Sequence, residues 1–194
     1  MSCSEYQMNK LPREFYAGDT IEVAKSLLGQ HLVHRSQGIE RVGKIVEVEA
    51  YLGEHDLAAH SSKGRTKRTE VIFGPAGFAY VYLIYGIYHC FNVVTESQGI
   101  GSAILIRAIE PVMNITGRTQ GPGLLCQAMT LDKQHNGHDL LSDDLFIAKD
   151  HTAPVMPIIE APRIGVHYAK DWALKPLRFY IEGNAFVSKL VKKL

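Results

Sequence analysis

Two glutamates, a tyrosine and a histidine form the group of residues with the clearest capacity for chemistry. At the two-residue period of a β-strand, the odd-numbered positions of residues 45–51 share one side, which carries Glu47, Glu49 and Tyr51. His60 follows nine residues after Tyr51. The other side holds valine and alanine and can join a core. A carboxylate on the polar side, facing a cleft beside an aromatic wall, can activate water as a general base.

The same residues allow other chemistry. Two carboxylates about 6.6 Å apart along a strand could serve a hydrolase that cleaves sugars or free nucleosides. For Glu47 we favour a solvent-facing or salt-bridged position instead. His55, Asp56 and His60 form a loose group of possible metal ligands. Their spacing fits no standard zinc signature, so we expect no metal site.

The second informative feature is a run rich in tyrosine, residues 80–88, which a single glycine interrupts. Aromatic and β-branched residues favour strands. The run therefore predicts a strand, a tight turn near Tyr85-Gly86 and a strand that returns through residues 92–94. Most tyrosines of such a hairpin would pack in a core. At a hairpin tip, however, Tyr85 would project outward, where an aromatic ring is useful for contact.

Basic residues gather in one short segment, although the formal net charge of the chain is only +1. Lys63, Arg65, Lys67 and Arg68 are interspersed with small residues such as Thr66. The segment lies between the histidine and the tyrosine run. This placement favours contact with nucleic-acid phosphates over a merely solvated face. The lysines near the C-terminus carry no such argument.

Length and composition predict one domain over residues 1–194, with residues 1–16 as an N-terminal arm. The hydrophobic fraction of 46% is typical of a soluble globule. No apolar stretch approaches the roughly 20 residues of a membrane span, and the N-terminus lacks the apolar core of a signal peptide. The three cysteines follow no zinc or disulfide pattern. We therefore expect a cytoplasmic protein (nuclear in a eukaryote) with no membrane partner, and nothing demands more than a monomer.

The remaining pattern predicts the elements that would position these residues. Asp19 or Thr20 can cap a helix that runs to Leu28 and stops at Gly29. A second helix should begin at Pro122. Strands are expected at residues 31–34, 42–51, 103–110, 145–148, 164–166 and 177–181, with a hairpin over 78–95 and one helical turn at 55–60. The pattern therefore favours an α+β fold with a dominantly antiparallel sheet.

These features occur in an order that resembles a known family. The motifs are, in chain order, Ile45-Val46-Glu47-Val48-Glu49-Ala50-Tyr51-Leu52-Gly53, Asp56-x-Ala58-Ala59-His60-Ser61, Tyr80-Val81-Tyr82-x-x-Tyr85-Gly86, Leu105-Ile106-Arg107-Ala108-x-Glu110-Pro111, Gly121-Pro122-Gly123, Pro162-Arg163-Ile164-Gly165 and Pro176-Leu177-Arg178-Phe179-Tyr180. Over about residues 27–188 they resemble the 3-methyladenine DNA glycosylases of the alkyladenine glycosylase family. The resemblance implies a single-domain α+β fold with a mainly antiparallel curved β-sheet, flanking helices and a protruding β-hairpin.

The resemblance also implies an activity. The protein would be a monofunctional DNA glycosylase of base excision repair that needs no cofactor. Its partner would be double-stranded DNA containing a damaged purine, and it would attack the N-glycosidic bond with water, not with an amine. Glu49 would activate the water, Arg107 would orient Glu49, and the main-chain carbonyl of Ile164 would lie near the water. Through its DNA, the protein would be associated with the nucleoid.

Further residues would bind the lesion and the duplex. Tyr51, His60 and Tyr82 would sandwich a flipped base such as 3-methyladenine, 7-methylguanine, hypoxanthine or ethenoadenine. Asn92 would reject guanine by crowding its amino group. The residues expected to contact the DNA itself are Tyr85 and Gly86 at the hairpin tip, and Arg65, Thr66 and Arg68 in the basic segment.

The chain departs from the family on the DNA-binding side. Leu124 stands where the family commonly has a lysine after Gly-Pro-Gly, and residues 111–121 are short, with only Arg118 as a cation. We therefore expect intact chemistry with weaker or more salt-sensitive DNA binding. Two other functions remain open. One is a damaged-DNA-binding module without catalysis, and the other is a hydrolase of free nucleosides, which would need neither Tyr85 nor the basic segment.

Overall fold

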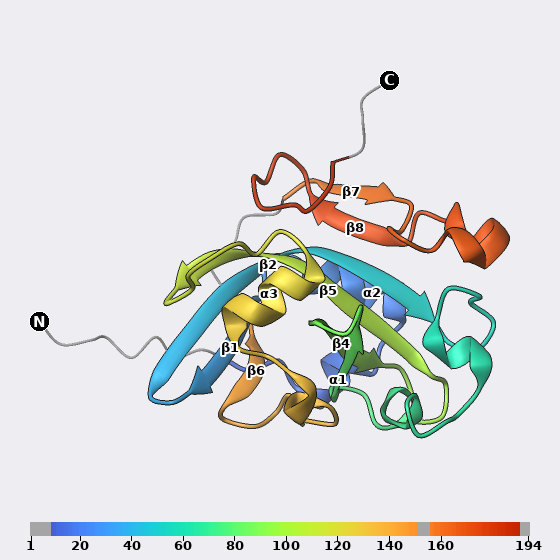
Figure 1. The fold of residues 1–194 in the computed structure, drawn as a ribbon, viewed down its shortest axis with the longest axis horizontal. Helices are drawn as coiled ribbons and strands as arrows, with labels where there is room; N and C mark the ends of the chain where they lie inside the picture. The colour runs from blue at the N-terminus through green and yellow to red at the C-terminus, as the bar shows by residue number, and fades with distance from the viewer. Residues whose placement is uncertain (1–8, 151–155, 191–194) are drawn as a thin grey trace, which may run out of the picture.

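A computed structural model describes residues 9–150 and 156–190, and eight strands of this part form one sheet. The sheet runs in the order β3-β4-β5-β2-β1-β6, while β8 pairs with β2 and β7 (Figure 1). Every pairing of these strands is antiparallel. The strands are β1 (His31–Ser36), β2 (Ile39–Leu52), β3 (Ala79–Ile84), β4 (Tyr88–Thr95), β5 (Ser102–Met113), β6 (Leu145–Ala148), β7 (Ile158–Ala161) and β8 (Arg178–Ile181).

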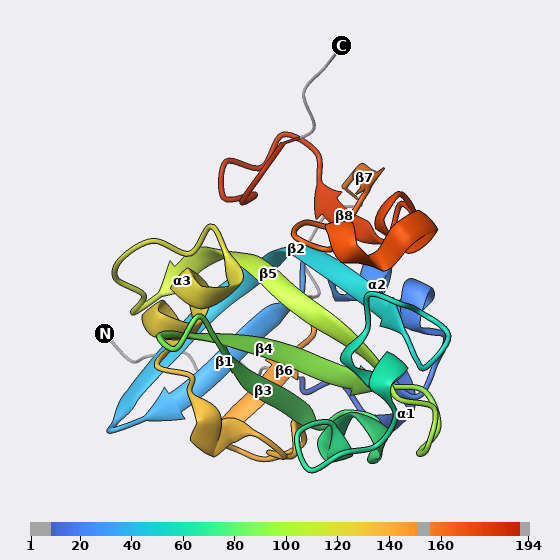
Figure 2. The same cartoon turned by 45° about the vertical axis from the view of Figure 1, so that its right-hand side comes forward.

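Short helices flank the curled sheet, as Figure 2 shows. The α-helices of the described residues are α1 (Arg13–Tyr16), α2 (Thr20–Leu27) and α3 (Pro122–Met129), and the 3-10 helices are η1 (His60–Lys63), η2 (Glu70–Phe73), η3 (Lys133–His135) and η4 (His167–Ala173). Together with the antiparallel sheet, they confirm the predicted α+β class. None of these helices is long and apolar enough to cross a bilayer.

Strand β2 occupies the centre of the sheet. Strand β5 pairs with one of its edges from Val42 to Leu52. On the other edge, β1 pairs with residues 39–44 and β8 pairs with Glu47, Val48 and Glu49 (Figure 1). The two glutamates therefore lie in a strand with neighbours on both sides. This position explains why both glutamate side chains are completely buried.

The predicted alternation along β2 fails at one end. The register between β2 and β5 shifts between Ile45 and Glu47, as at a β-bulge, so the strict two-residue period is interrupted there. Ile45 and Val46 consequently both belong to the main hydrophobic core. From Glu47 onward the prediction is correct: Val48 and Ala50 enter the core, while Glu49 lines a cleft on the opposite side.

The two longer α-helices begin as their sequences predict. The Asp19 side chain accepts hydrogen bonds from the amides of Ile21 and Glu22 and so caps α2. Helix α3 begins at Pro122 and packs against β4 and β5. Its Gly123 is needed for this packing, because a Cβ there would lie 2.7 Å from the ring of Tyr88. The start of α3 thus supports the return strand of the hairpin.

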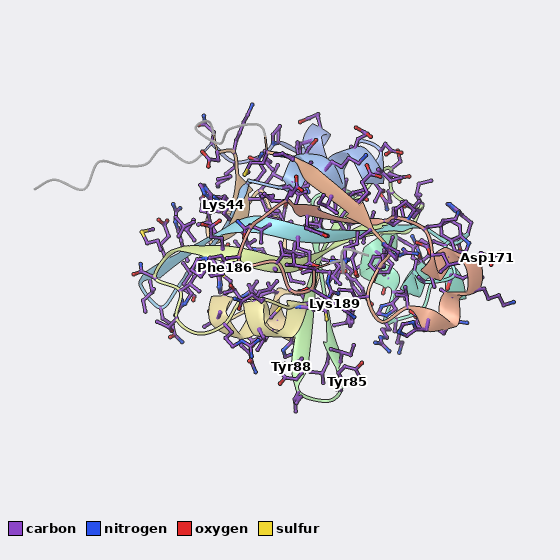
Figure 3. All side chains as sticks on the ribbon, turned by 90° about the horizontal axis from the view of Figure 1, so that it is seen from above. Lys44, Tyr85, Tyr88, Asp171, Phe186 and Lys189 are labelled. Carbon is purple, nitrogen blue, oxygen red and sulfur yellow. The ribbon has the colours of Figure 1, made fainter. Side chains whose placement is uncertain are left out.

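Strands β3 and β4 form the predicted hairpin, which extends beyond the rest of the molecule at Tyr85 (Figure 3). Ile84 pairs with Tyr88, and Tyr85 and Gly86 in the turn have φ angles of 53° and 73°. Both angles are in the left-handed region that hairpin turns require. The Tyr85 side chain is 86% exposed, as expected for a ring at a tip.

Three predictions about local structure need correction. The predicted N-terminal arm is in part a structured segment, because α1 forms there and Tyr16 is completely buried; residues 1–8 lie outside the described part. The helical turn expected at 55–60 begins only at His60, since the Asp56 carboxylate binds the amides of Leu52 and Ala58 and holds a loop.

The strand expected at residues 164–166 is also absent, and the strand of this region is β7. Gly165 has a φ of 79°, which breaks an extended path. The amide of Ile164 is not in a ladder but donates to a side chain of β2. The apolar character of the segment serves packing instead, since Val166 is buried against Ala58.

Candidate active site

A cleft of about 460 Å³ opens between β2, β5, the hairpin, η1 and the loop that follows β7. It brings together most of the residues predicted for a site. Those that line it are Glu49, Tyr51, His60, Arg68, Tyr82, Tyr85, Asn92, Arg107 and Ile164. Gly86, Arg65 and Thr66 are the predicted residues that do not line it.

Glu49 lies in this cleft with three neighbours that stabilise a carboxylate. Its Oε2 accepts a 2.8 Å hydrogen bond from the hydroxyl of Tyr51, and its Oε1 accepts a 2.7 Å bond from the amide of Ile164. The Arg107 guanidinium lies 3.4 Å from Oε1. Fixed donors on both oxygens hold the carboxylate in one orientation, so it can act as a base or as a negative charge beside a reacting atom.

Arg107 lies between two buried carboxylates. Its Nη1 faces Glu49, and its Nε lies 3.5 Å from Oε1 of Glu47. Burial opposes the charge of Arg107, but the two glutamates outweigh it, and the pKa of Arg107 is raised above its usual value. The guanidinium is therefore a permanent cation in the wall of the cleft.

Glu47 has a different environment from Glu49. Its Oε1 accepts a 2.8 Å bond from Arg178 of β8, and its Oε2 accepts a 2.7 Å bond from the amide of Ser188. The salt-bridged position predicted for Glu47 is correct, whereas the solvent-facing alternative is wrong because the side chain is fully buried. Because Glu47 does not line the cleft, it is not arranged as a second catalytic carboxylate.

The cleft that Glu49 lines also has an aromatic wall. The ring centroids of His60 and Tyr82 are 4.5 Å apart, and Nδ1 of His60 lies 3.0 Å from the hydroxyl of Tyr80. Burial, followed by the nearby charge of Arg68, lowers the pKa of His60, so the ring is neutral at pH 7. Burial likewise raises the pKa of the Tyr82 phenol. Uncharged rings of this kind can hold a planar aromatic ligand.

Asn92 lies in the wall of the same cleft. Its side-chain amide donates to the main-chain oxygen of Tyr80 at 3.0 Å and of Cys90 at 3.3 Å. These bonds fix the side chain on β4. Ile164 contributes a different main-chain group from the one expected: the observed contact is its amide donating to Glu49.

The basic segment is only partly in the cleft. The Arg68 guanidinium lies over the Tyr82 ring, 5.8 Å from its centroid. Arg65 donates to the main-chain oxygen of Phe73, and Thr66 bonds with Thr69, so these two residues fix the loop beside the cleft. Gly86 lies outside the cleft in the hairpin turn.

Asp56 has a structural environment, not that of a metal ligand. Its two oxygens pair with Arg163 at 2.5 and 2.9 Å, and both side chains are completely buried. The Arg163 guanidinium also lies over the ring of Tyr51. In residues 9–150 and 156–190 there is no group of three side chains that could together hold a metal ion.

Sequence reasoning missed several residues of the cleft, namely Tyr80, Tyr88 and Tyr168. Tyr80 shares a face of β3 with Tyr82 at the two-residue period, so the pattern contained the signal for it. Tyr168 comes from η4, and nothing local in the sequence places that helix beside η1. Its hydroxyl donates to the main-chain oxygen of Ala58 at 3.2 Å.

Comparisons with known proteins identify the family of the chain. The profile of the family described as methylpurine-DNA glycosylase matches residues 14–185. A protein of Legionella pneumophila (strain Corby) is 65% identical over 182 residues, which cover 94% of this chain and all of the relative. A protein of Anaeromyxobacter (strain Fw109-5) is 55% identical over 93% of both chains, and one of Myxococcus xanthus is 52% identical over 94% of this chain and 95% of its own. All three are provisionally named 3-methyladenine DNA glycosylases. These matches confirm the resemblance seen in the sequence motifs, and the chain belongs to the methylpurine-DNA glycosylase family.

Proposed function

We propose that this protein removes alkylated or deaminated purines from double-stranded DNA by hydrolysing their N-glycosidic bonds. The observation that carries the proposal is the position of Glu49. It is a fully buried carboxylate that Tyr51, Ile164 and Arg107 hold on the cleft side of β2, across from an aromatic wall. Membership of the methylpurine-DNA glycosylase family supports hydrolysis of an N-glycosidic bond as the reaction, and this geometry is suited to it.

The damaged base enters the cleft only after it leaves the duplex. Flipping a base costs a few kcal/mol in lost stacking and pairing. The exposed ring of Tyr85, at the tip of the hairpin, occupies the vacated space and contacts the neighbouring bases. The hairpin therefore couples DNA binding to extrusion of the base.

The flipped base stacks against Tyr51, His60 and Tyr82. An N-alkylated purine such as 3-methyladenine is cationic, so aromatic faces favour it over normal adenine. Such a base is also a good leaving group. Asn92, fixed by its bonds to Tyr80 and Cys90, crowds the exocyclic amino group of guanine.

Hydrolysis then needs one base and one water. As the glycosidic bond breaks, its electron pair leaves with the purine and positive charge develops on the sugar. The Glu49 carboxylate stabilises that charge and takes a proton from the attacking water, whose oxygen forms the new bond to the sugar. Arg107 fixes the orientation of Glu49. Among the described residues that line the cleft there is no lysine, so the nucleophile is water and no strand cleavage follows.

A single set of measurements tests this function. We expect the wild-type protein to release hypoxanthine from a duplex oligonucleotide and Tyr85→Ala to lose most of this activity. On the same lesion in a single strand, Tyr85→Ala should retain more activity, because the base does not have to be extruded from a duplex. Leu174→Ala is the matched control, because Leu174 is also exposed but does not line the cleft.

The alternatives give different results. Release of hypoxanthine from free inosine at an equal rate by the wild-type protein and Tyr85→Ala would favour a nucleoside hydrolase. Binding of lesion DNA without any release would favour a binding module. If Tyr85→Ala loses the same share of activity on duplex and on single-stranded DNA, Tyr85 does not act by filling the space that the flipped base leaves.

A further inference from the structure

A second cleft, of about 450 Å³, adjoins the first. Ala59, His60, Arg68 and Tyr168 line both clefts. The rest of its wall comes from the loop around η1 and from Lys170 of η4. The two clefts therefore share one wall.

Three cations converge on this second cleft. Lys63, Arg68 and Lys170 line it, and its described lining includes no aspartate or glutamate. These three cations are exposed, and none of them has an ion pair in the described part of the chain. Converging unpaired cations repel one another and raise the local concentration of anions.

The cleft also offers a neutral hydrogen-bond donor. Ser62 lines it and carries a hydroxyl group, whereas the hydroxyls of Thr66 and Thr69, which also line it, bond with each other. Hydroxyl donors beside lysine and arginine are the combination that proteins use to hold the oxygens of a DNA phosphate.

The backbone of Lys170 is strained. Its φ of 52° and ψ of −132°, at a kink within η4, belong to a region that residues other than glycine rarely adopt. Strain of this kind persists where the surrounding structure enforces it, and it gathers at functional sites. Here its effect is to place a lysine in the wall of a cleft that already holds Lys63 and Arg68.

We propose that the second cleft binds a backbone phosphate of the lesion-bearing strand, next to the flipped nucleotide, through Lys63 and Lys170. Arg68, which lines both clefts, connects this phosphate site to the wall of the base cleft. The site supplies phosphate contacts to a chain that has leucine at position 124 and a net charge of only +1. The proposal rests on the proposed function, because it requires a flipped nucleotide in the first cleft.

The first test compares the salt dependence of binding. The probe is a duplex with one hypoxanthine nucleotide whose 2′-fluoro sugar resists hydrolysis. For the double variant Lys63→Gln/Lys170→Gln we expect weaker binding and a slope of log K against log salt that is smaller by about one for each lost contact. The control is Lys133→Gln/Lys149→Gln, whose lysines are exposed and line neither cleft.

The second test locates the phosphate. Neutral methylphosphonate linkages replace individual phosphates on either strand of the same probe. At one position beside the lesion, on the lesion-bearing strand, the replacement should weaken binding by the wild-type protein but not by the double variant. Additive effects at every position, or a double variant that binds like the control, would overturn the proposal. A wild-type protein that releases no base from ordinary lesion DNA would overturn the proposed function instead.

Discussion

The main-chain amide of Ile164 donates a 2.7 Å hydrogen bond to Oε1 of Glu49, across 115 residues of sequence. The loop after β7 is thus tied directly to the carboxylate at the centre of the sheet. Because the donor belongs to the backbone, the contact does not depend on the side chain at position 164. The other oxygen of Glu49 depends on a side chain, the hydroxyl of Tyr51.

Because one donor is a side chain and the other is the backbone, we expect different effects from substitutions at positions 51 and 164. Tyr51→Phe removes one donor, leaves the ring and lets the carboxylate rotate. A hydrogen bond to a charged group contributes about 1.5–3 kcal/mol, so we expect single-turnover base release to slow by about 10- to 100-fold. Ile164→Ala keeps the amide and should stay within a few-fold of the wild-type rate. Equal rates for Tyr51→Phe and the wild type would show that this hydrogen bond does not position the base.

Glu47 should matter for folding and not for chemistry. Glu47→Gln leaves Arg178 buried without its charge partner, and breaking a buried pair costs about 3–5 kcal/mol. Urea denaturation measures this loss. The control is Glu40→Gln, whose pair with Arg35 is partly exposed and contributes only about 0–1 kcal/mol. A Glu47→Gln protein that is as stable as the wild type but releases no base would instead support the two-carboxylate hydrolase.

Stability should fall as the pH falls from 7.5 to 5.5. Burial lowers the pKa values of His31, His34 and His60 below 6.5 in the folded protein. As the pH drops through 6.5, the unfolded chain therefore binds more protons than the folded protein. The free energy of unfolding consequently decreases between pH 6.5 and the lower pKa values of the folded protein. Urea denaturation at several pH values checks this. His60→Gln should reduce the slope of the free energy of unfolding against pH. An unchanged slope would show that His60 does not contribute to this pH dependence.

The sequence correctly predicted the structural elements that depend on residues close together in the chain. The Asp19 cap and the apolar face of α2 are within one short segment, and so are the turn residues Tyr85 and Gly86. The side of β2 that carries Glu49 followed from its two-residue period. These elements could be predicted because a cap, a turn or an alternating strand depends on neighbouring residues.

The rest depends on contacts that are distant in sequence. Arg178 reaches Glu47 because β8 pairs with β2, and Arg163 reaches Asp56 across 107 residues. The bulge after Ile45 depends on how β5 is registered against β2. The second cleft needs η4 beside η1. No period or motif in either partner specifies such pairings. For this reason the sequence left a solvent-facing position open for Glu47, and it wrongly predicted a strand at residues 164–166, where the amide of Ile164 instead binds Glu49.

In the proposed reaction, Glu49 activates water for base release. Its most direct test is single-turnover release of hypoxanthine from duplex DNA by the wild-type protein and by Glu49→Gln, with binding of each to the same duplex measured in parallel. We predict that Glu49→Gln still binds the lesion but releases the base at least about 100-fold more slowly, the usual size of a general-base contribution. Release by Glu49→Gln at the wild-type rate would contradict the account.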